Sequence, residues 1–149
     1  MEGDPVPHQD GFVNTRHLSR WESGGSDKMN EARIFKLDEL QWKKLKADYC
    51  DVPLYDKPLV NDPETGMSVA VSRYEKGFHL EWHTHTCAHG MYILEGKLRT
   101  SIGEALPGDF VWFPAGMAME HGATVEEDCT FLFITNRPFD IHYLRDDKE

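Results

Sequence analysis

The sequence has only three cysteines, and none of them belongs to a CxxC pair. Cys50, Cys87 and Cys129 are an odd number, which argues against a disulfide framework and against a zinc-ribbon site. The chain also lacks any uncharged apolar stretch near the roughly 20 residues that a membrane-spanning helix needs. Its N-terminus has no basic start followed by an apolar run, so we expect no secretory leader and a cytoplasmic protein.

Positive charge is scarce as well. The chain carries 16 Lys and Arg residues against 26 Asp and Glu residues, a formal net charge of −10. This field repels phosphate groups, so we expect neither nucleic acid nor a membrane surface as a partner. The 149 residues, 40% of them hydrophobic, are enough for one domain with a packed core.

The first 32 residues differ in composition from the rest. They are rich in Gly, Ser, Asp and Asn, and we expect a flexible N-terminal arm over 1–32 followed by a single domain over 33–149. One partly apolar stretch interrupts the arm, GFVNTRHLSRW at 11–21. It is either disordered or lies on a neighbouring subunit through Phe12, Val13, Leu18 and Trp21, and we expect a homodimer formed through this region.

The next two segments predict elements outside the main strands. Residues 34–49 suggest a short strand and then a helical turn capped by Asp38, forming a lid or an edge of the domain. Residues 51–66 contain three prolines and several Asp and Asn residues, which favour extended and turn conformations over helix.

From Met67 onward the chain alternates short apolar runs with Gly and Pro turns. Such spacing predicts an all-β domain, a sandwich or a small barrel, because no amphipathic helix separates the runs as a parallel sheet would require. The predicted strands are SVAVSRY, HLEWHTH, GMYILEG, KLRTSI, DFVWFP, MEHGATV, CTFLFIT and FDIHYL.

Histidines gather in one of these runs. In HLEWHTHTCAHG, a period of two places His79, Glu81, His83 and His85 on one face of a strand, and His89 can return from the next strand. A single such histidine is more often hydrogen-bonded on a polar face. Burying three imidazoles within seven residues, however, costs desolvation free energy for each ring, and a shared metal ion satisfies all three.

The spacing around these histidines resembles the first motif of the cupin superfamily. Gly77, His83, His85 and Gly96 match that motif, and His89 occupies the position of its glutamate. The resemblance implies a double-stranded β-helix, a jelly-roll barrel, that holds one divalent metal ion per chain.

The second cupin motif is met by Gly108, Pro114 and Gly116, with Met119 in place of its histidine. His121 follows two residues later with the same strand parity, so a slightly longer loop would bring it to the metal as the fourth ligand. The resemblance covers roughly residues 66–136 and implies the fold and the metal far more specifically than the reaction.

Three functions stay open at this point. With His89 in place of the glutamate, the ligand set is neutral, and we favour a non-haem Fe(II) dioxygenase acting on a small enolisable or aromatic compound. The first alternative is a non-redox cyclase, isomerase or hydrolase that uses Zn, Ni or Mn as a Lewis acid. The second is a metal- or ligand-binding cupin without catalysis.

Other residues are candidates for the reaction itself. Glu81 is the candidate general acid or base, unless it is a solvated charge at the strand end. His79 is a candidate substrate contact, with a plain surface imidazole as the alternative. A consistent strand parity would also place apolar side chains against a substrate, although core packing explains them equally well. These are Met91, Trp112, Met119 and Phe131.

Overall fold

The structure is a computed structural model, and it describes residues 30–148. The segment 11–21 and most of the predicted arm lie outside the described residues. None of the helices in the described part is long and apolar enough to span a membrane.

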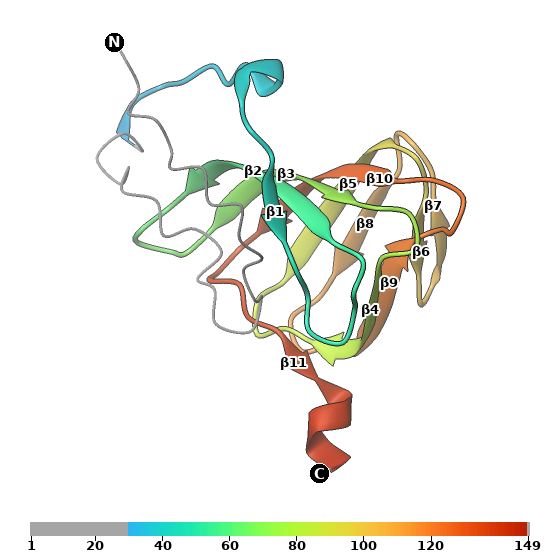
Figure 1. The fold of residues 1–149 in the computed structure, drawn as a ribbon. Coiled ribbons are helices and arrows are strands. Elements are labelled where there is room, and N and C mark those ends of the chain that lie inside the picture. Colours follow the sequence, from blue (N-terminus) through green and yellow to red (C-terminus); the bar gives the residue numbers. More distant parts are fainter. Residues whose placement is uncertain (1–29, 149) are drawn as a thin grey trace.

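Two antiparallel sheets form the domain (Figure 1). The six-stranded sheet has the order β1-β2-β3-β10-β5-β8, and the five-stranded sheet has the order β11-β4-β9-β6-β7. The predicted all-β jelly-roll class is confirmed. The strands are β1 (Lys43–Leu45), β2 (Leu54–Asn61), β3 (Ser68–Tyr74), β4 (His79–Thr84), β5 (His89–Glu95), β6 (Leu98–Thr100), β7 (Gly103–Ala105), β8 (Phe110–Phe113), β9 (Met119–Ala123), β10 (Cys129–Thr135) and β11 (His142–Tyr143).

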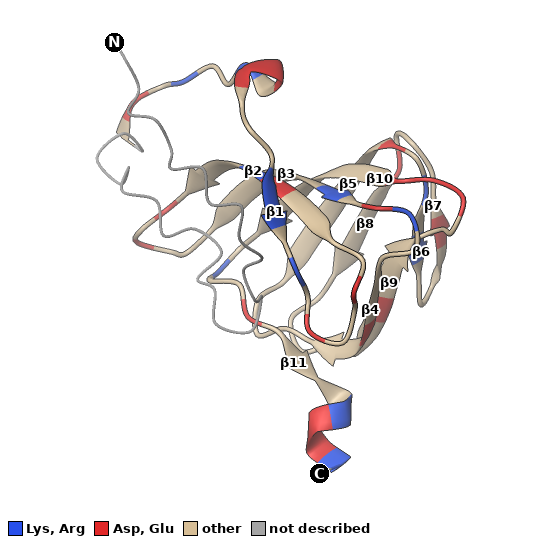
Figure 2. Ribbon diagram, in the orientation of Figure 1, with Lys and Arg blue, Asp and Glu red and all other residues tan. Residues whose placement is uncertain are grey.

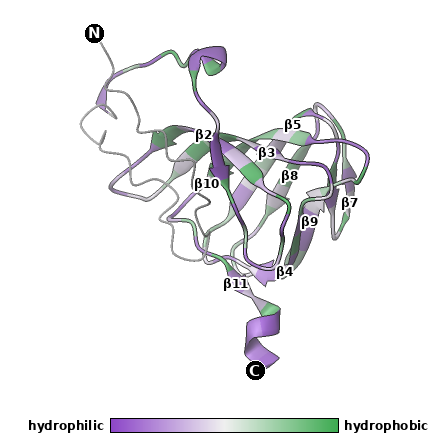
Figure 3. Cartoon of the chain, in the orientation of Figure 1, coloured by the Kyte–Doolittle hydropathy of each residue, from purple (hydrophilic) through white to green (hydrophobic). Residues whose placement is uncertain are grey.

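The core lies between the two sheets and follows the alternation of each strand. In β10, Cys129, Phe131, Phe133 and Thr135 are buried, whereas Thr130, Leu132 and Ile134 between them are half-buried on the outer side. Full burial of a large apolar side chain stabilises the fold by about 1.5–3 kcal/mol. Hydrophobic residues follow the central strands, whereas most loops and the C-terminal turn are hydrophilic (Figure 3).

The segment before the first strand departs from its prediction. A 3₁₀ turn, η2 (Leu37–Glu39), precedes β1, so the order of turn and strand is reversed. Lys36 is the N-cap, and Asp38 lies within the turn and caps nothing. A strand fits after the turn because Leu45 reaches the core from β1, which pairs with β2.

A β-bulge in β4 changes which side chains face the core. Leu80 pairs with His121, but Met119, two residues back along β9, pairs with His83 instead of Trp82. The extra residue in β4 places both Leu80 and His83 inside the barrel. The prediction that His79 and Glu81 share the inward face is therefore wrong.

Candidate metal centre

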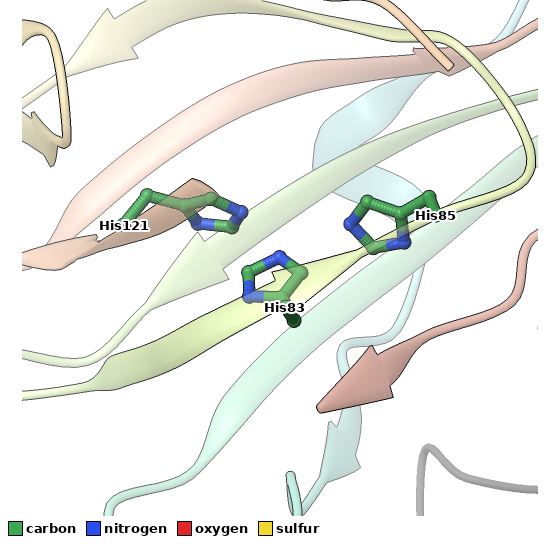
Figure 4. A group of neighbouring side chains, drawn as sticks. All are labelled: His83, His85 and His121. Atoms are coloured by element: carbon green, nitrogen blue, oxygen red, sulfur yellow. The ribbon is translucent and has the colours of Figure 1, made fainter. Parts of the chain in front are cut away.

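Three histidines from two neighbouring strands meet inside the barrel (Figure 4). His83 lies on β4, His85 directly follows it, and His121 lies on β9, which pairs with β4. One ligand nitrogen from each ring lies within 4.8 Å of the others. Two nitrogens bound to one ion at about 2.0–2.2 Å are at most about 4.4 Å apart, so small side-chain adjustments suffice for this group to hold a metal ion.

Backbone carbonyls orient two of the rings. His83 Nδ1 lies 2.6 Å from the carbonyl oxygen of Glu81, and His85 Nδ1 hydrogen-bonds the carbonyl of Asp140. A carbonyl only accepts, so each Nδ1 carries the proton and donates it. This tautomer places the lone pair of each ring on Nε2, the nitrogen that would bind a metal ion.

The third ring has a side-chain partner. His121 Nδ1 lies 3.2 Å from the hydroxyl of Tyr74, and the two rings stack at a centroid distance of 5.8 Å. Tyr74 is itself 2% exposed, so it fixes the His121 ring from β3. Each histidine of the group thus has a hydrogen bond on Nδ1.

The Nε2 atoms, on the other side of each ring from Nδ1, show whether the group fits a metal ion. Nε2 of His83 and Nε2 of His121 are buried, and neither has a hydrogen-bond partner among the described residues. An unpaired buried polar atom costs about 1–3 kcal/mol, and a cation among these nitrogens removes that cost. The residues present therefore fit a metal ion.

Burial also keeps these rings neutral. Desolvation lowers the pKa of His83 to about 4 and that of His121 well below its usual value. A neutral imidazole is the form that binds a metal, so the site needs no proton release from these two rings near neutral pH.

His89 lies beside this group without joining it. Its ring on β5 is fully buried, with its centroid 4.8 Å from that of His85 and 6.3 Å from that of His121. Its role as a further ligand stays a prediction. Met119, which replaces the second-motif histidine, is buried in the hydrophobic core, whereas His121 is the residue that reaches the cluster.

A small cavity adjoins two of the histidines. Its volume is about 20 Å³, the room of one or two water molecules. No residue lining it among those described carries a carboxylate, an ammonium or a guanidinium group. The lining consists of Ala47, Leu54, Tyr74, Leu80, His85, His121, Phe133, Phe139 and Ile141.

Glu81, the predicted acid or base, points away from this cavity. Its carboxylate accepts a hydrogen bond of 2.8 Å from the guanidinium of Arg145, which is half exposed. The bulge explains the difference, since Leu80 takes the inward position that period-two alternation gave to Glu81. Glu81 contributes to the site only through its backbone carbonyl.

His79 also lies on the outer side of the barrel. Its ring is 2.7 Å from the guanidinium of Arg99 and 3.3 Å from the carboxylate of Glu120. Burial is the largest cause of its lowered pKa, and the Arg99 charge adds to it. This polar cluster gives His79 a structural role and no contact with the cavity.

The predicted apolar contacts divide into two groups. Trp112 is 51% exposed because β8 turns Val111 and Phe113 inward, opposite to the assumed parity. Every residue of this strand is apolar, so the sequence pattern does not define its inner face. The other three candidates are fully buried in the core without lining the cavity, namely Met91, Met119 and Phe131.

Several residues of the site were not predicted. Tyr74 ends the predicted strand SVAVSRY, and Phe139 and Ile141 belong to the predicted strand FDIHYL, so the sequence pattern gives them no role beyond the strand. Ala47 lies in the segment predicted as a lid or an edge, and that prediction is the only sequence signal that any of these residues lies near the site. These residues meet only because chain segments nearly 100 residues apart close over the same opening.

The segment 136–141, here called the cap segment, is held against the turn that follows β4. Asn136 exchanges two hydrogen bonds with Ala88, at 2.9 Å through its side chain and 3.2 Å through its backbone. The carboxylate of Asp140 accepts a 2.7 Å bond from the backbone N–H of Thr86, next to the carbonyl that orients His85. Asp140 thus holds the cap segment next to the histidine group, through Thr86 and His85.

We expect Asp140→Ala to weaken metal binding by about tenfold, the lower end of the effect of losing an outer-shell partner. The alanine frees the cap segment and with it the carbonyl that holds His85. Chelator competition on purified protein measures the dissociation constant.

Asp140→Asn is the matched control, because its amide oxygen still accepts the bond from Thr86. His85, Cys87 and Asp140 also offer ligand atoms within 4.8 Å of one another. Equal losses in the Asn and Ala variants would contradict a positioning role and point to the carboxylate as a ligand.

Comparison with known proteins agrees with this architecture. A cupin-like protein from Thermotoga maritima is 22% identical with a TM-score of 0.61, over 76% of this chain and 89% of that chain. The polyketide cyclase RemF from Streptomyces resistomycificus is 15% identical with a TM-score of 0.65, over 76% and 86%. A proposed acetylacetone dioxygenase from Methylibium petroleiphilum is 15% identical with a TM-score of 0.61, over 79% and 92%. No curated protein sequence matches the chain significantly.

At these identities the structural likeness establishes the cupin fold alone. The family model of the ChrR cupin-like domain matches residues 30–140. The chain therefore belongs to the ChrR cupin-like family.

Proposed function

We propose that this protein is a non-haem Fe(II) dioxygenase that acts on a small enolisable or aromatic compound. The observation that carries the proposal is a buried, all-nitrogen ligand group next to an apolar cavity whose described lining has no carboxylate. When bound, Fe(II) would supply open coordination positions for substrate and O₂. The chain's own residues hold and orient the ligands and exclude water.

Among the described residues, the cavity lining contains no carboxylate and no ammonium group, and this separates the proposal from its Lewis-acid alternative. Hydrolysis, isomerisation and cyclisation need a side chain that moves a proton at the reacting atoms. Glu81 and His79, the two predicted candidates, are both engaged outside the barrel. Tyr74 is the remaining hydroxyl in the lining, and its bond to His121 already engages it. An enol that has lost its proton to solvent needs no further proton transfer from the protein at the carbon that reacts with O₂, which favours O₂ chemistry.

The size of the cavity limits the substrate. About 20 Å³ accommodates a diatomic gas or one or two waters, so a larger compound has to displace the cap segment, from which Phe139 and Ile141 reach the cavity. A small β-diketone is the first compound to test, because it enolises and binds an ion through two oxygens. The fold shared with the proposed acetylacetone dioxygenase supports acetylacetone as that probe.

The test begins with untagged protein purified without oxygen. We expect about one Fe(II) per chain by mass spectrometry and, with NO, the EPR spectrum of a high-spin iron nitrosyl. Oxygen uptake with acetylacetone then measures turnover, with His83→Ala as the inactive control. Zinc, nickel or manganese without a nitrosyl spectrum would contradict the proposal in favour of Lewis-acid chemistry. Bound iron without oxygen uptake for any small enolisable or aromatic compound would favour a binding cupin.

A further inference from the structure

The strongest feature outside the metal centre is a groove between two sheet edges. It has a volume of about 320 Å³ and lies between β7, the edge of the five-stranded sheet, and β8, the edge of the six-stranded sheet. Its lining residues are Thr100, Ile102, Gly103, Glu104, Ala105, Asp109, Phe110, Val111 and Trp112. Neither edge has a further strand partner in the described part of the chain, so backbone N–H and C=O groups remain available there.

Part of an exposed apolar surface lines this groove, through Ile102, Phe110 and Trp112. Six of the twelve exposed large hydrophobic residues in the described part of the chain lie between residues 92 and 112, on β5, on β8 and in the turns before and after β7. They are Tyr92, Leu94, Ile102, Leu106, Phe110 and Trp112. Phe110 lies over Gly90, where an added Cβ would come within 2.3 Å of its ring, so the absence of a side chain at 90 leaves room for the ring. Clustered exposed apolar residues of this kind mark an interaction surface.

The charges at the groove are of one sign. Glu104 and Asp109 are the charged residues of the lining, and both are acidic (Figure 2 shows the acidic colour on β7). An extended peptide with apolar and basic side chains matches this surface in hydrogen bonding, hydrophobicity and charge.

The chain contains one such peptide. Residues 11–21, GFVNTRHLSRW, have four large apolar residues, two arginines and no acidic residue, in a protein whose net charge is −10. We propose that the groove between β7 and β8 binds this segment from a second copy of the chain, with Arg16 and Arg20 next to Glu104 and Asp109.

The length of the chain before residue 30 indicates that the bound segment comes from a second copy. The described chain begins on the β1 side of the molecule, at the opposite edge of the six-stranded sheet from β8 (Figure 1). Five strand intervals of about 4.8 Å separate these edges by about 24 Å. Residues 22–29 span at most about 28 Å when fully extended, which leaves almost no length for a path around the sheet. Two copies that exchange segments meet no such limit and form a closed, symmetric dimer.

Sedimentation velocity of the full-length protein tests the proposal. Wild type is expected to sediment as a dimer, twice the chain mass of 17.2 kDa. Trp112→Ser in the groove and the pair Phe12→Ser with Trp21→Ser in the segment are each expected to raise the dimer dissociation constant by roughly 30-fold, the effect of a strong interface residue. Trp112 is half exposed, so its replacement leaves the core intact.

Two further variants make the result specific. Trp82→Ser removes a tryptophan that is 47% exposed on β4, outside the groove, and should leave the dimer unchanged. Arg16→Glu with Arg20→Glu should weaken the dimer, and adding Glu104→Arg should restore part of the lost affinity, because Asp109 keeps its negative charge. A wild type that is monomeric at all concentrations, or segment variants that remain dimeric, would overturn the proposal. Metal content measured on the same samples keeps this outcome separate from the function proposed for the barrel interior.

Discussion

Replacing His83 by alanine is expected to lower metal affinity by more than about 100-fold, so that the purified variant retains almost no metal. Loss of an outer-shell partner alone typically costs about 10–100-fold, and His83 contributes a buried Nε2 with no hydrogen-bond partner in the described chain. Metal content by mass spectrometry and chelator competition measure the effect.

His79→Ala is the control on the same strand. His79 lies with Arg99 and Glu120 on the outer side, so its loss should leave the metal content unchanged. Equal metal content in the His83 variant and wild type would contradict the site.

His121→Ala should also lower the metal content, because His121 is the β9 member of the group. Met119→Leu preserves the volume of the core and should leave the metal content unchanged. A reversed result for this pair would show that the register of the second motif was misassigned. Metal content of both variants therefore tests the departure from the family pattern directly.

The metal-free protein is expected to lose stability as the pH falls from about 6.5 to about 4. Burial lowers the pKa of His83 to about 4 and that of His121 well below normal, whereas both titrate near 6.5 in the unfolded chain. Within this range the unfolded state binds more protons, so the free energy of unfolding decreases with falling pH. Each ring contributes up to about 1.4 kcal/mol per pH unit. Urea unfolding of chelator-treated protein at several pH values measures the slope.

His83→Gln supplies the control for this pH dependence. The glutamine cannot take up a proton, so the metal-free variant should show a shallower slope by up to one proton. Identical slopes for wild type and His83→Gln would contradict the assignment of His83 as a buried neutral ring.

Much of the fold was predictable because local chemistry and tertiary structure agree. The runs at 68–74, 79–85 and 129–135 correspond to β3, β4 and β10 within a residue or so, since alternating apolar residues between Gly and Pro turns favour strands in any surroundings. The turn over Leu37–Glu39 and the following β1 were predicted in the wrong order. Short elements at an edge depend on what they pack against more than on their own sequence.

Strand faces were the weaker part of the prediction. In β8 every residue from Phe110 to Phe113 is apolar, so neither face is preferred until β5 and the core position the strand. In β4 the extra residue between Leu80 and His83 reverses which residues of the preceding part of the strand point inward, so Leu80 faces the core and His79 does not. A bulge is a property of two paired strands, and one strand's sequence does not reveal it.

The sequence by itself determined the all-β class and the histidines, because strand alternation and the spacing of His83 and His85 are local properties of the chain. Tertiary structure alone decided the surroundings of these histidines. It brought His121 to the pair, added Tyr74 behind it, excluded Glu81 and closed the cavity with residues 47, 139 and 141. These relations join residues far apart in the chain, and they depend on register and packing, which are fixed only when the two sheets come together.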